Sequence, residues 1–229
     1  MMKLEVVRAP RRALVVLSGG QDSTTCLFLA RMLFDELLTI TFDYGQRHLV
    51  ELDAAAEIAR LAGSLEHRVV DLRGYGGIAA SALTRANQGV MERRADGLPS
   101  TFVPGRNLAF LVVASSYAVV NGIHDVVTGV CRTDFSGYPD CREDAIRALE
   151  HAVNLGIGAD NPVRIHTPLM WMTKAETVRM ARRLPGCWEA LAKSITCYQG
   201  KVPGCGECPS CQLRAKGFRE ANELDPAAP

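Results

Sequence analysis

The sequence has no uninterrupted apolar run long enough to cross a membrane. Its longest apolar stretch, Leu108–Val120, is broken by two serines and a tyrosine and is shorter than the roughly 18 to 20 residues that a span requires. The pair Arg11-Arg12 precedes an apolar run that is too short for a twin-arginine export signal and that leads directly to Gln21-Asp22. We therefore expect a cytoplasmic protein without a membrane partner.

Net charge is nearly absent as well. The 26 basic and 25 acidic residues leave a formal net charge of +1, without the basic excess that nucleic-acid-binding proteins often carry. We therefore expect small-molecule substrates and no nucleic-acid partner. Internal repeats and low-complexity tracts are also lacking. A chain of 229 residues with 48% hydrophobic content favours one sizeable core, as one large domain or as a domain with an appendage.

Two common phosphate-binding motifs, G-x-x-x-x-G-K-[ST] and G-x-G-x-x-G after a strand, are missing. A different glycine turn is present. Residues 13–17 form an apolar run typical of a strand buried on both faces, and a helical pattern begins at Asp22. Between them, Gly19 and Gly20 allow positive φ and close approach of a ligand to the backbone.

The start of the helix after this turn favours an anion. Asp22, Ser23 and Thr24 are candidate helix caps, and the free N–H groups and dipole of a first helical turn favour negative charge such as a phosphate. The alternative is an ordinary strand–turn–helix junction with glycine for geometry and polar residues for capping.

Hydrophobic periodicity predicts alternating strands and helices along the rest of the chain. Further strands are predicted at 37–42, 68–72, 125–130 and 163–167, and helices at 22–34, 50–62, 106–120 and 142–155, with another helix from the capping box Thr173-x-x-Glu176 and a last short helix near the C-terminus. The repeated strand–helix order implies a parallel sheet with right-handed crossovers. Residues 73–105 have no clear period, and we interpret them as a long loop that covers an active site.

Four of the eight cysteines lie within 15 residues, spaced C-x7-C-x2-C-x2-C: Cys197, Cys205, Cys208 and Cys211. This clustering favours a metal site in a reducing compartment over a secreted disulfide framework. Four thiolates complete a tetrahedral set and leave no position for water, so we expect one structural Zn²⁺. An iron–sulfur cluster, a redox dithiol pair and disulfides are the alternatives.

Polar loops provide the remaining candidate ligands for phosphate or substrate. They follow predicted strands or open predicted helices, and they contain Gln46, Arg47, His48, Arg106, Asn107, Arg132, Asp134, Asp140, Arg142 and Lys174. An arginine can bind a phosphate or carboxylate bidentately, and a carboxylate can accept hydrogen bonds from a guanine-like heterocycle. A lysine in a first helical turn opposes the dipole, so a bound anion would explain Lys174. Solvated polar residues at turns and helix starts are the plain alternative.

The segment Ser18-Gly-Gly-Gln-Asp-Ser23 resembles the S-G-G-x-D-S loop of the ATP pyrophosphatase (PP-loop) superfamily. In that superfamily the loop holds the pyrophosphate end of ATP while a substrate is adenylated. Together with segments 41–48, 101–107, 128–142 and 167–171 and the four cysteines, residues 13–218 resemble the 7-cyano-7-deazaguanine synthase family of queuosine biosynthesis.

The resemblance implies an α/β fold with a five-stranded parallel doubly wound sheet and an appended four-cysteine zinc loop. It implies conversion of 7-carboxy-7-deazaguanine, ammonia and ATP to the nitrile, by a homodimer. We expect a lead-in at 1–12, an ATP-binding catalytic domain at 13–186 and a zinc-binding region at 187–229 packed on it. Asp22 is the candidate contact for Mg²⁺ with ATP. The expected ATP-binding residues are Leu17, Ser18, Gly19, Gly20, Gln21, Asp22, Ser23, Thr24, Thr25, Cys26 and Leu27.

Two other functions stay open at this point. A tRNA-thiolating PP-loop enzyme shares the adenylating loop, but it would need a sulfur-carrying cysteine near ATP, for which Cys131 or Cys141 would have to serve. A non-catalytic nucleotide-binding or zinc-binding module is the other possibility. Low net charge disfavours the tRNA enzyme, and the many polar loops at strand ends disfavour the module.

Overall fold

A parallel five-stranded sheet forms the centre of the computed structural model, which describes residues 9–79, 81–85, 87–132, 137–158 and 162–228. The strand order is β3-β2-β1-β4-β5, and every neighbouring pair is parallel. The strands are β1 (Arg12–Val16), β2 (Glu36–Asp43), β3 (Glu66–Asp71), β4 (Asp125–Val127) and β5 (Arg164–His166). The predicted five-stranded parallel sheet is confirmed.

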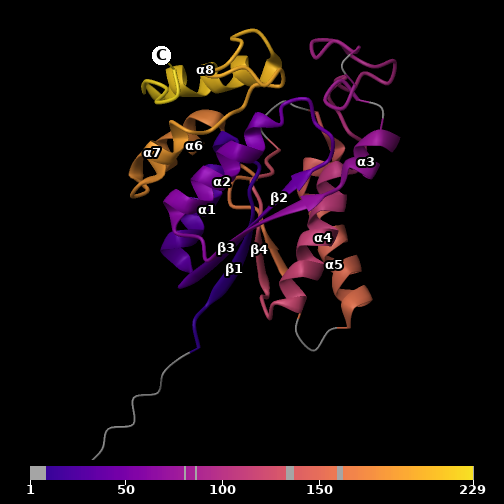
Figure 1. The fold of residues 1–229 in the computed structure, drawn as a ribbon, viewed down its shortest axis with the longest axis vertical. Coiled ribbons are helices and arrows are strands. Elements are labelled where there is room, and N and C mark those ends of the chain that lie inside the picture. The colour runs from indigo at the N-terminus through magenta and orange to yellow at the C-terminus, as the bar shows by residue number, and fades with distance from the viewer. Residues whose placement is uncertain (1–8, 80, 86, 133–136, 159–161, 229) are drawn as a thin grey trace, which may run out of the picture.

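Helices cover both faces of the sheet (Figure 1). One face carries α1 (Gln21–Leu33), α2 (Val50–Ala62), α6 (Lys174–Arg183) and α7 (Cys187–Leu191), and the other carries α4 (Arg106–Val120) and α5 (Glu143–Ile157). The position of β1 in the centre of the sheet explains why its sequence is apolar throughout. Ala13 and Val15 belong to the core on the first face, and Leu14 belongs to the core on the second. Such two-sided burial requires an unbroken apolar run rather than alternation.

Two predicted helix boundaries are confirmed and one is corrected. Helix α2 ends at Gly63 with a φ of 71°, and α6 begins with the Thr173/Glu176 capping box. Helix α1 begins at an extended Gly20, with no side-chain cap. Ser23 and Thr24, predicted as caps, instead donate their hydroxyl hydrogens to the Gly20 carbonyl, at 3.1 and 2.8 Å. The first-turn N–H groups of α1 therefore do not depend on a side-chain cap.

The long segment 73–105 is more ordered than the predicted loop. It begins with helix α3 (Arg73–Ile78) and contains a bridge between Arg93 and Pro99. The side chain of Arg47 donates to the carbonyl oxygens of Ala82 and Gln88 and ties this segment to the loop after β2. Side-chain-to-backbone bonds of this kind have no periodic signature in a sequence, which is why the segment looked structureless.

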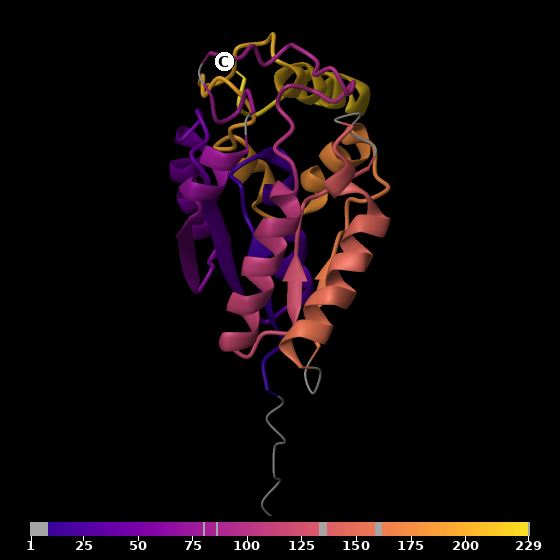
Figure 2. The ribbon, with the colours of Figure 1, turned by 90° about the vertical axis from the view of Figure 1, so that its right-hand side faces the viewer.

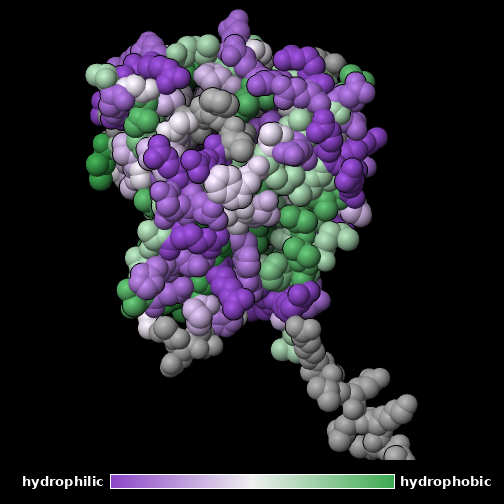
Figure 3. Space-filling model, turned by 180° about the vertical axis from the view of Figure 1, so that it is seen from behind, coloured by the Kyte–Doolittle hydropathy of each residue, from purple (hydrophilic) through white to green (hydrophobic). Residues whose placement is uncertain are grey.

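The C-terminal part forms a lid-like layer above the carboxyl ends of the strands (Figure 2). Helix α8 (Pro209–Ala221) has 13 residues, rather than being the short helix that was predicted, and it packs on α6. Seen from behind, the molecule is largely hydrophilic, with hydrophobic residues gathered along one side of its lower half (Figure 3). Among the described helices, none combines the length and the apolar character needed to cross a membrane.

Candidate active site and metal centre

A cavity of about 580 Å³ lies at the carboxyl ends of β1, β2 and β4. Because the connection after β1 runs toward β2 and the connection after β4 runs to the opposite side, toward β5, this is the place where open α/β sheets bind ligands. The residues predicted from the sequence that line the cavity are Leu17, Ser18, Gly20, Gln21, Asp22, Ser23, His48, Arg106, Asn107 and Lys174.

The turn after β1 has the geometry of an anion site. Gly19 has a φ of +79°, and a Cβ there would lie 2.4 Å from the backbone oxygen of Glu51, so only glycine fits. The turn leads into α1, whose first N–H groups have no intrahelical acceptor. Gln21 is 2% exposed, and both polar atoms of its side chain lack a hydrogen-bond partner among the described residues. An unsatisfied buried amide at a cavity wall favours a polar ligand.

Lys174 comes from the distant start of α6 and meets this turn. Its Nζ lies 2.6 Å from Oδ2 of Asp22, and the two side chains are 10% and 24% exposed. The sequence predicted that an anion near Lys174 would explain its position at a helix start. The structure supplies the carboxylate of Asp22, so a positive and a negative group lie together beside the turn after β1.

Arg106 lies among aromatic rings in the same cavity. Its guanidinium carbon lies 5.5 Å from the ring centre of Tyr44 and 5.9 Å from that of Tyr138, within the range of a cation–π contact. Burial raises the pKa of Tyr44, so this phenol stays neutral. Burial by itself lowers the pKa of Arg106, but Tyr44, Tyr138 and Asp140 more than offset it and raise the pKa. A permanent cation between flat rings suits a flat, carboxylated ligand.

Glu51 is a cavity residue that the sequence analysis missed. Its carboxylate lies 3.1 Å from Nε2 of His48 and accepts a hydrogen bond of 3.0 Å from the side chain of Gln46. An acidic residue in the first turn of a helix is so common that the sequence gives no signal for it. The spacing of Gln46, His48 and Glu51, directly after a strand, is the one feature that could have found it. Tyr44, Thr128 and Tyr138 also line the cavity; they lie in segments 41–48 and 128–142, which the sequence analysis favoured, but they were not among its candidate ligands.

Other predicted residues do not line the cavity. Gly19, Thr24, Thr25, Cys26 and Leu27 form the buried side of the turn and helix, while Gln46, Arg47, Arg132, Asp140 and Arg142 lie behind or outside the wall. Asp140 accepts a 2.9 Å hydrogen bond from the backbone N–H of Asn107 and so caps α4. Arg132 lies over the ring of Trp171, with its guanidinium carbon 5.2 Å from the ring centre. Asp134 lies outside the described residues.

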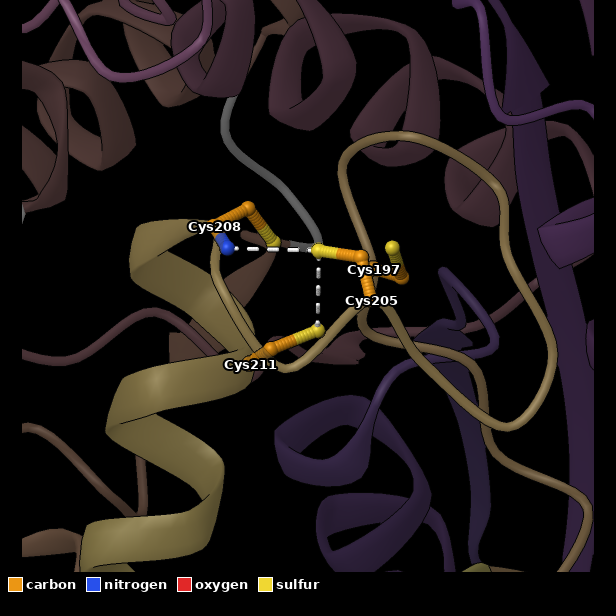
Figure 4. Close-up of side chains that lie close together, drawn as sticks. All are labelled: Cys197, Cys205, Cys208 and Cys211. Atoms are coloured by element: carbon orange, nitrogen blue, oxygen red, sulfur yellow. Dashed lines mark hydrogen bonds between the residues drawn. The ribbon is translucent and has the colours of Figure 1, made fainter.

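The four clustered cysteines converge on one point (Figure 4). Their sulfur atoms all lie within 4.8 Å of one another, and those of Cys205 and Cys211 are 3.9 Å apart. A tetrahedral ion with bonds of about 2.3 Å to sulfur requires sulfur–sulfur distances of roughly 3.8 Å. Burial raises the pKa of Cys205, but N–H groups of Cys208 and Glu207 together outweigh burial and lower it to about 7. The cluster therefore fits a metal ion.

A central parallel strand followed by this turn, with polar loops at the same sheet edge, defines an open, doubly wound α/β fold whose cavity lies at the carboxyl ends of its strands. A crystal structure of a 4-thiouridine synthetase–RNA complex with bound ATP has a TM-score of 0.52 to this chain at 17% identity. The match covers 93% of this chain and 50% of that one. A likeness at this level shows the fold alone.

The sequence comparisons are more specific. Residues 12–222 match the family model described as queuosine biosynthesis protein QueC. A protein of Chromobacterium violaceum named 7-cyano-7-deazaguanine synthase is 54% identical over 219 residues, covering 94% of this chain and 92% of that protein. One of the same name from Laribacter hongkongensis is 52% identical, covering 97% and 96%. The chain belongs to the QueC family of queuosine biosynthesis proteins, as the resemblance implied.

Proposed function

We propose that this chain is an ATP-dependent ligase that converts 7-carboxy-7-deazaguanine and ammonia to 7-cyano-7-deazaguanine, with release of AMP and pyrophosphate. One observation carries the proposal: a single cavity holds the anion-binding turn with the Lys174–Asp22 pair and also Arg106 with its two tyrosines. These two parts suit a nucleotide triphosphate and a flat carboxylated heterocycle. The names of the two bacterial relatives support the same reaction.

The chemistry begins with a carboxylate, which is a poor electrophile. A carboxylate oxygen attacks the α-phosphorus of ATP, pyrophosphate leaves, and an acyl-adenylate results. Ammonia displaces AMP from the acyl carbon and loses a proton, which gives the amide. The amide oxygen then attacks the α-phosphorus of a second ATP, with loss of another pyrophosphate. Loss of AMP and of the remaining nitrogen-bound protons leaves the nitrile.

Residues of the cavity are placed to bind the charged groups of the substrates and of the leaving pyrophosphate. The first-turn N–H groups of α1 and the ammonium group of Lys174 would hold the leaving pyrophosphate. Arg106 would orient the carboxylate of the heterocycle, with Tyr44 and Tyr138 beside the ring. Asp22 would hold Mg²⁺, which neutralises phosphate charge when it is bound with ATP.

The four cysteines would hold one Zn²⁺ in a structural role. A closed set of four thiolates leaves no coordination position for substrate, so the reaction steps above do not involve that ion. We also propose that the enzyme acts as a cytoplasmic homodimer, without nucleic-acid or membrane partners. Sedimentation velocity of the purified protein tests the dimer, and a monomer at micromolar concentration would contradict it.

The test of function is to incubate the protein with ATP, Mg²⁺, ammonium and 7-carboxy-7-deazaguanine, and to follow the heterocycle by mass spectrometry with AMP and pyrophosphate in parallel. We expect the nitrile together with AMP. The Asp22→Ala variant should lose on the order of 10³-fold in kcat/KM. Asp71→Ala is the control, because Asp71 is an aspartate at the end of β3 that pairs with Arg73 outside the cavity. Full turnover by Asp22→Ala would rule out the role of Asp22.

A tRNA-thiolating enzyme is the second candidate, because Cys131 and Cys141 both line the cavity. Such an enzyme would transfer sulfur through one of these thiols. Filter binding to tRNA at low salt, and turnover by the Cys131→Ser and Cys141→Ser variants, separate the two functions. We expect no tRNA retention and nitrile formation by both variants. Tight tRNA binding and loss of sulfur transfer in either variant would support the thiolating enzyme.

A further inference from the structure

Helix α8 contributes several residues to the cavity wall, and two of its residues contact the elements that carry the proposed reacting groups. Gly217 faces the start of α6, and Arg214 faces the segment 191–196. Each of these elements in turn contacts the phosphate-binding turn directly. The helix itself begins at Pro209, directly after Cys208, and Cys211 lies in its first turn.

The first contact places Lys174. A Cβ on Gly217 would lie 2.3 Å from Cγ and 2.9 Å from Cβ of Lys174, and 3.3 Å from its backbone carbonyl carbon. Those atoms are the rigid base of the side chain rather than its flexible end. The absent side chain of Gly217 is therefore what allows α8 to lie against Lys174, whose Nζ reaches Asp22 at 2.6 Å.

The second contact places the turn itself. Arg214 is 7% exposed, and its guanidinium donates to the hydroxyl oxygens of Ser194 and Thr196 at 2.8 and 2.9 Å. Asp225 holds the same guanidinium from the other side, at 2.6 and 2.8 Å. Between the two hydroxyl residues, the N–H of Ile195 donates to the carbonyl oxygen of Gly19 at 2.9 Å.

We propose that Gly217 and Arg214 are positioning residues that hold the phosphate-binding turn in its ligand-ready shape. Gly217 acts through Lys174 and Asp22, and Arg214 acts through Ile195 and Gly19. The inference concerns the turn's geometry, and its nucleotide readout rests on the proposed function.

The test compares two glycine-to-alanine changes in helices. Gly217→Ala should make the amides of residues 17–27 exchange with deuterium about tenfold faster in the ligand-free protein, because the turn opens more often. It should also weaken MgATP binding by about tenfold, since the turn must be reordered on binding. Gly156→Ala in α5 is the matched control, because a Cβ there meets no atom within 4 Å, and it should change neither readout.

A double change separates positioning from general loosening. In a Lys174→Gly background both clashing side-chain atoms, Cγ and Cβ, are gone, so adding Gly217→Ala should change the exchange of residues 17–27 by less than about twofold. A full tenfold increase in that background, or no increase in the single variant, would overturn the proposal. If Gly217→Ala does not fold, Thr196→Val removes only one bond to Arg214 and should speed the same exchange about threefold, with no change contradicting the role of Arg214.

Failure of the two proposals is distinguishable. If wild-type protein does not bind MgATP while Gly217→Ala still speeds exchange of the turn, the proposed function fails and the positioning role stands. If wild-type protein binds MgATP and Gly217→Ala changes neither exchange nor affinity, the positioning role fails and the proposed function stands.

Discussion

The sheet with its flanking helices and the cap above it are stabilised in different ways. We define the cap as residues 81–85, 87–105 and 194–211 together with α8. The sheet buries two large apolar clusters, one on each face. The cap contains two small clusters: one consists of Ala82, Val90, Cys197 and Cys208, and the other joins Leu83 and Val103 to Tyr44 of the loop after β2. The sheet is therefore held by large apolar clusters, whereas the cap combines small clusters with clustered thiols and side-chain-to-backbone hydrogen bonds.

The difference matters because the cavity lies between the two regions and takes its walls from both. A site of this kind loses function when either region fails, but for separate reasons. Loss of apolar burial unfolds the whole chain, whereas loss of the cap opens the site above an intact sheet. The predictions below test whether the two regions are separable in this way.

Metal removal should have the largest effect, and it should be confined to the cap. Structural zinc contributes on the order of 10 kcal/mol or more in small peptides, and the cap has little apolar burial to replace it. After treatment with a chelator, we expect hydrogen exchange in residues 81–105 and 195–221 to rise by more than about 100-fold, while β1 and β2 stay protected. An equal rise throughout the chain would contradict separability.

A substitution that leaves a void in the sheet core should have the next largest effect, and it should lower the stability of the whole chain. Ile40 in β2 is fully buried, so Ile40→Ala should lower the free energy of unfolding by about 2–5 kcal/mol without changing metal content. Val69→Ala in β3 is the control, because Val69 is 48% exposed and its truncation should cost less than about 0.5 kcal/mol. Urea denaturation and metal analysis measure both. Metal loss in folded Ile40→Ala protein would break the comparison.

Loss of the capping box of α6 should have the smallest effect, and it should show how far a local change at the edge of the cap affects the sheet region. Thr173 accepts from the N–H of Glu176 and precedes Lys174, so Thr173→Ala should cost about 1 kcal/mol and fray the turn that carries Lys174. Ser116→Ala, on the exposed surface of α4, should stay within about 0.5 kcal/mol. Thermal unfolding measures both changes. An equal cost at the two sites would show that the box does not stabilise α6.

The sheet could be predicted because its signals are local and periodic. The apolar run at 13–17 predicts a strand buried on both faces, and Leu14 and Val15 are buried on opposite faces of the sheet. The strand–turn–helix geometry after β1 could be predicted for the same reason, since Gly19 and the start of α1 are adjacent. Strand β4 is shorter than predicted because residues 128–130 continue past its last paired residue into the cavity wall, and β5 is one residue shorter at each end.

The rest of the site depends on pairings that no local pattern encodes. Asp22 and Lys174 are 152 residues apart, and only the packing of α6 brings them together. The sequence also placed polar residues near strand ends without showing which way each side chain points. Arg47 therefore looked equivalent to His48, but it donates to cap carbonyls while His48 lines the cavity.

The order of elements along the chain has a consequence for synthesis. Strands β1, β2 and β3 are neighbours in the sheet and are complete by residue 71, whereas all four clustered cysteines lie after residue 196. Domains fold from the N-terminus as the ribosome extends them. The sheet can therefore begin to assemble long before the four cysteines are translated. The proposed ion would join only chains in which all five strands have already been made.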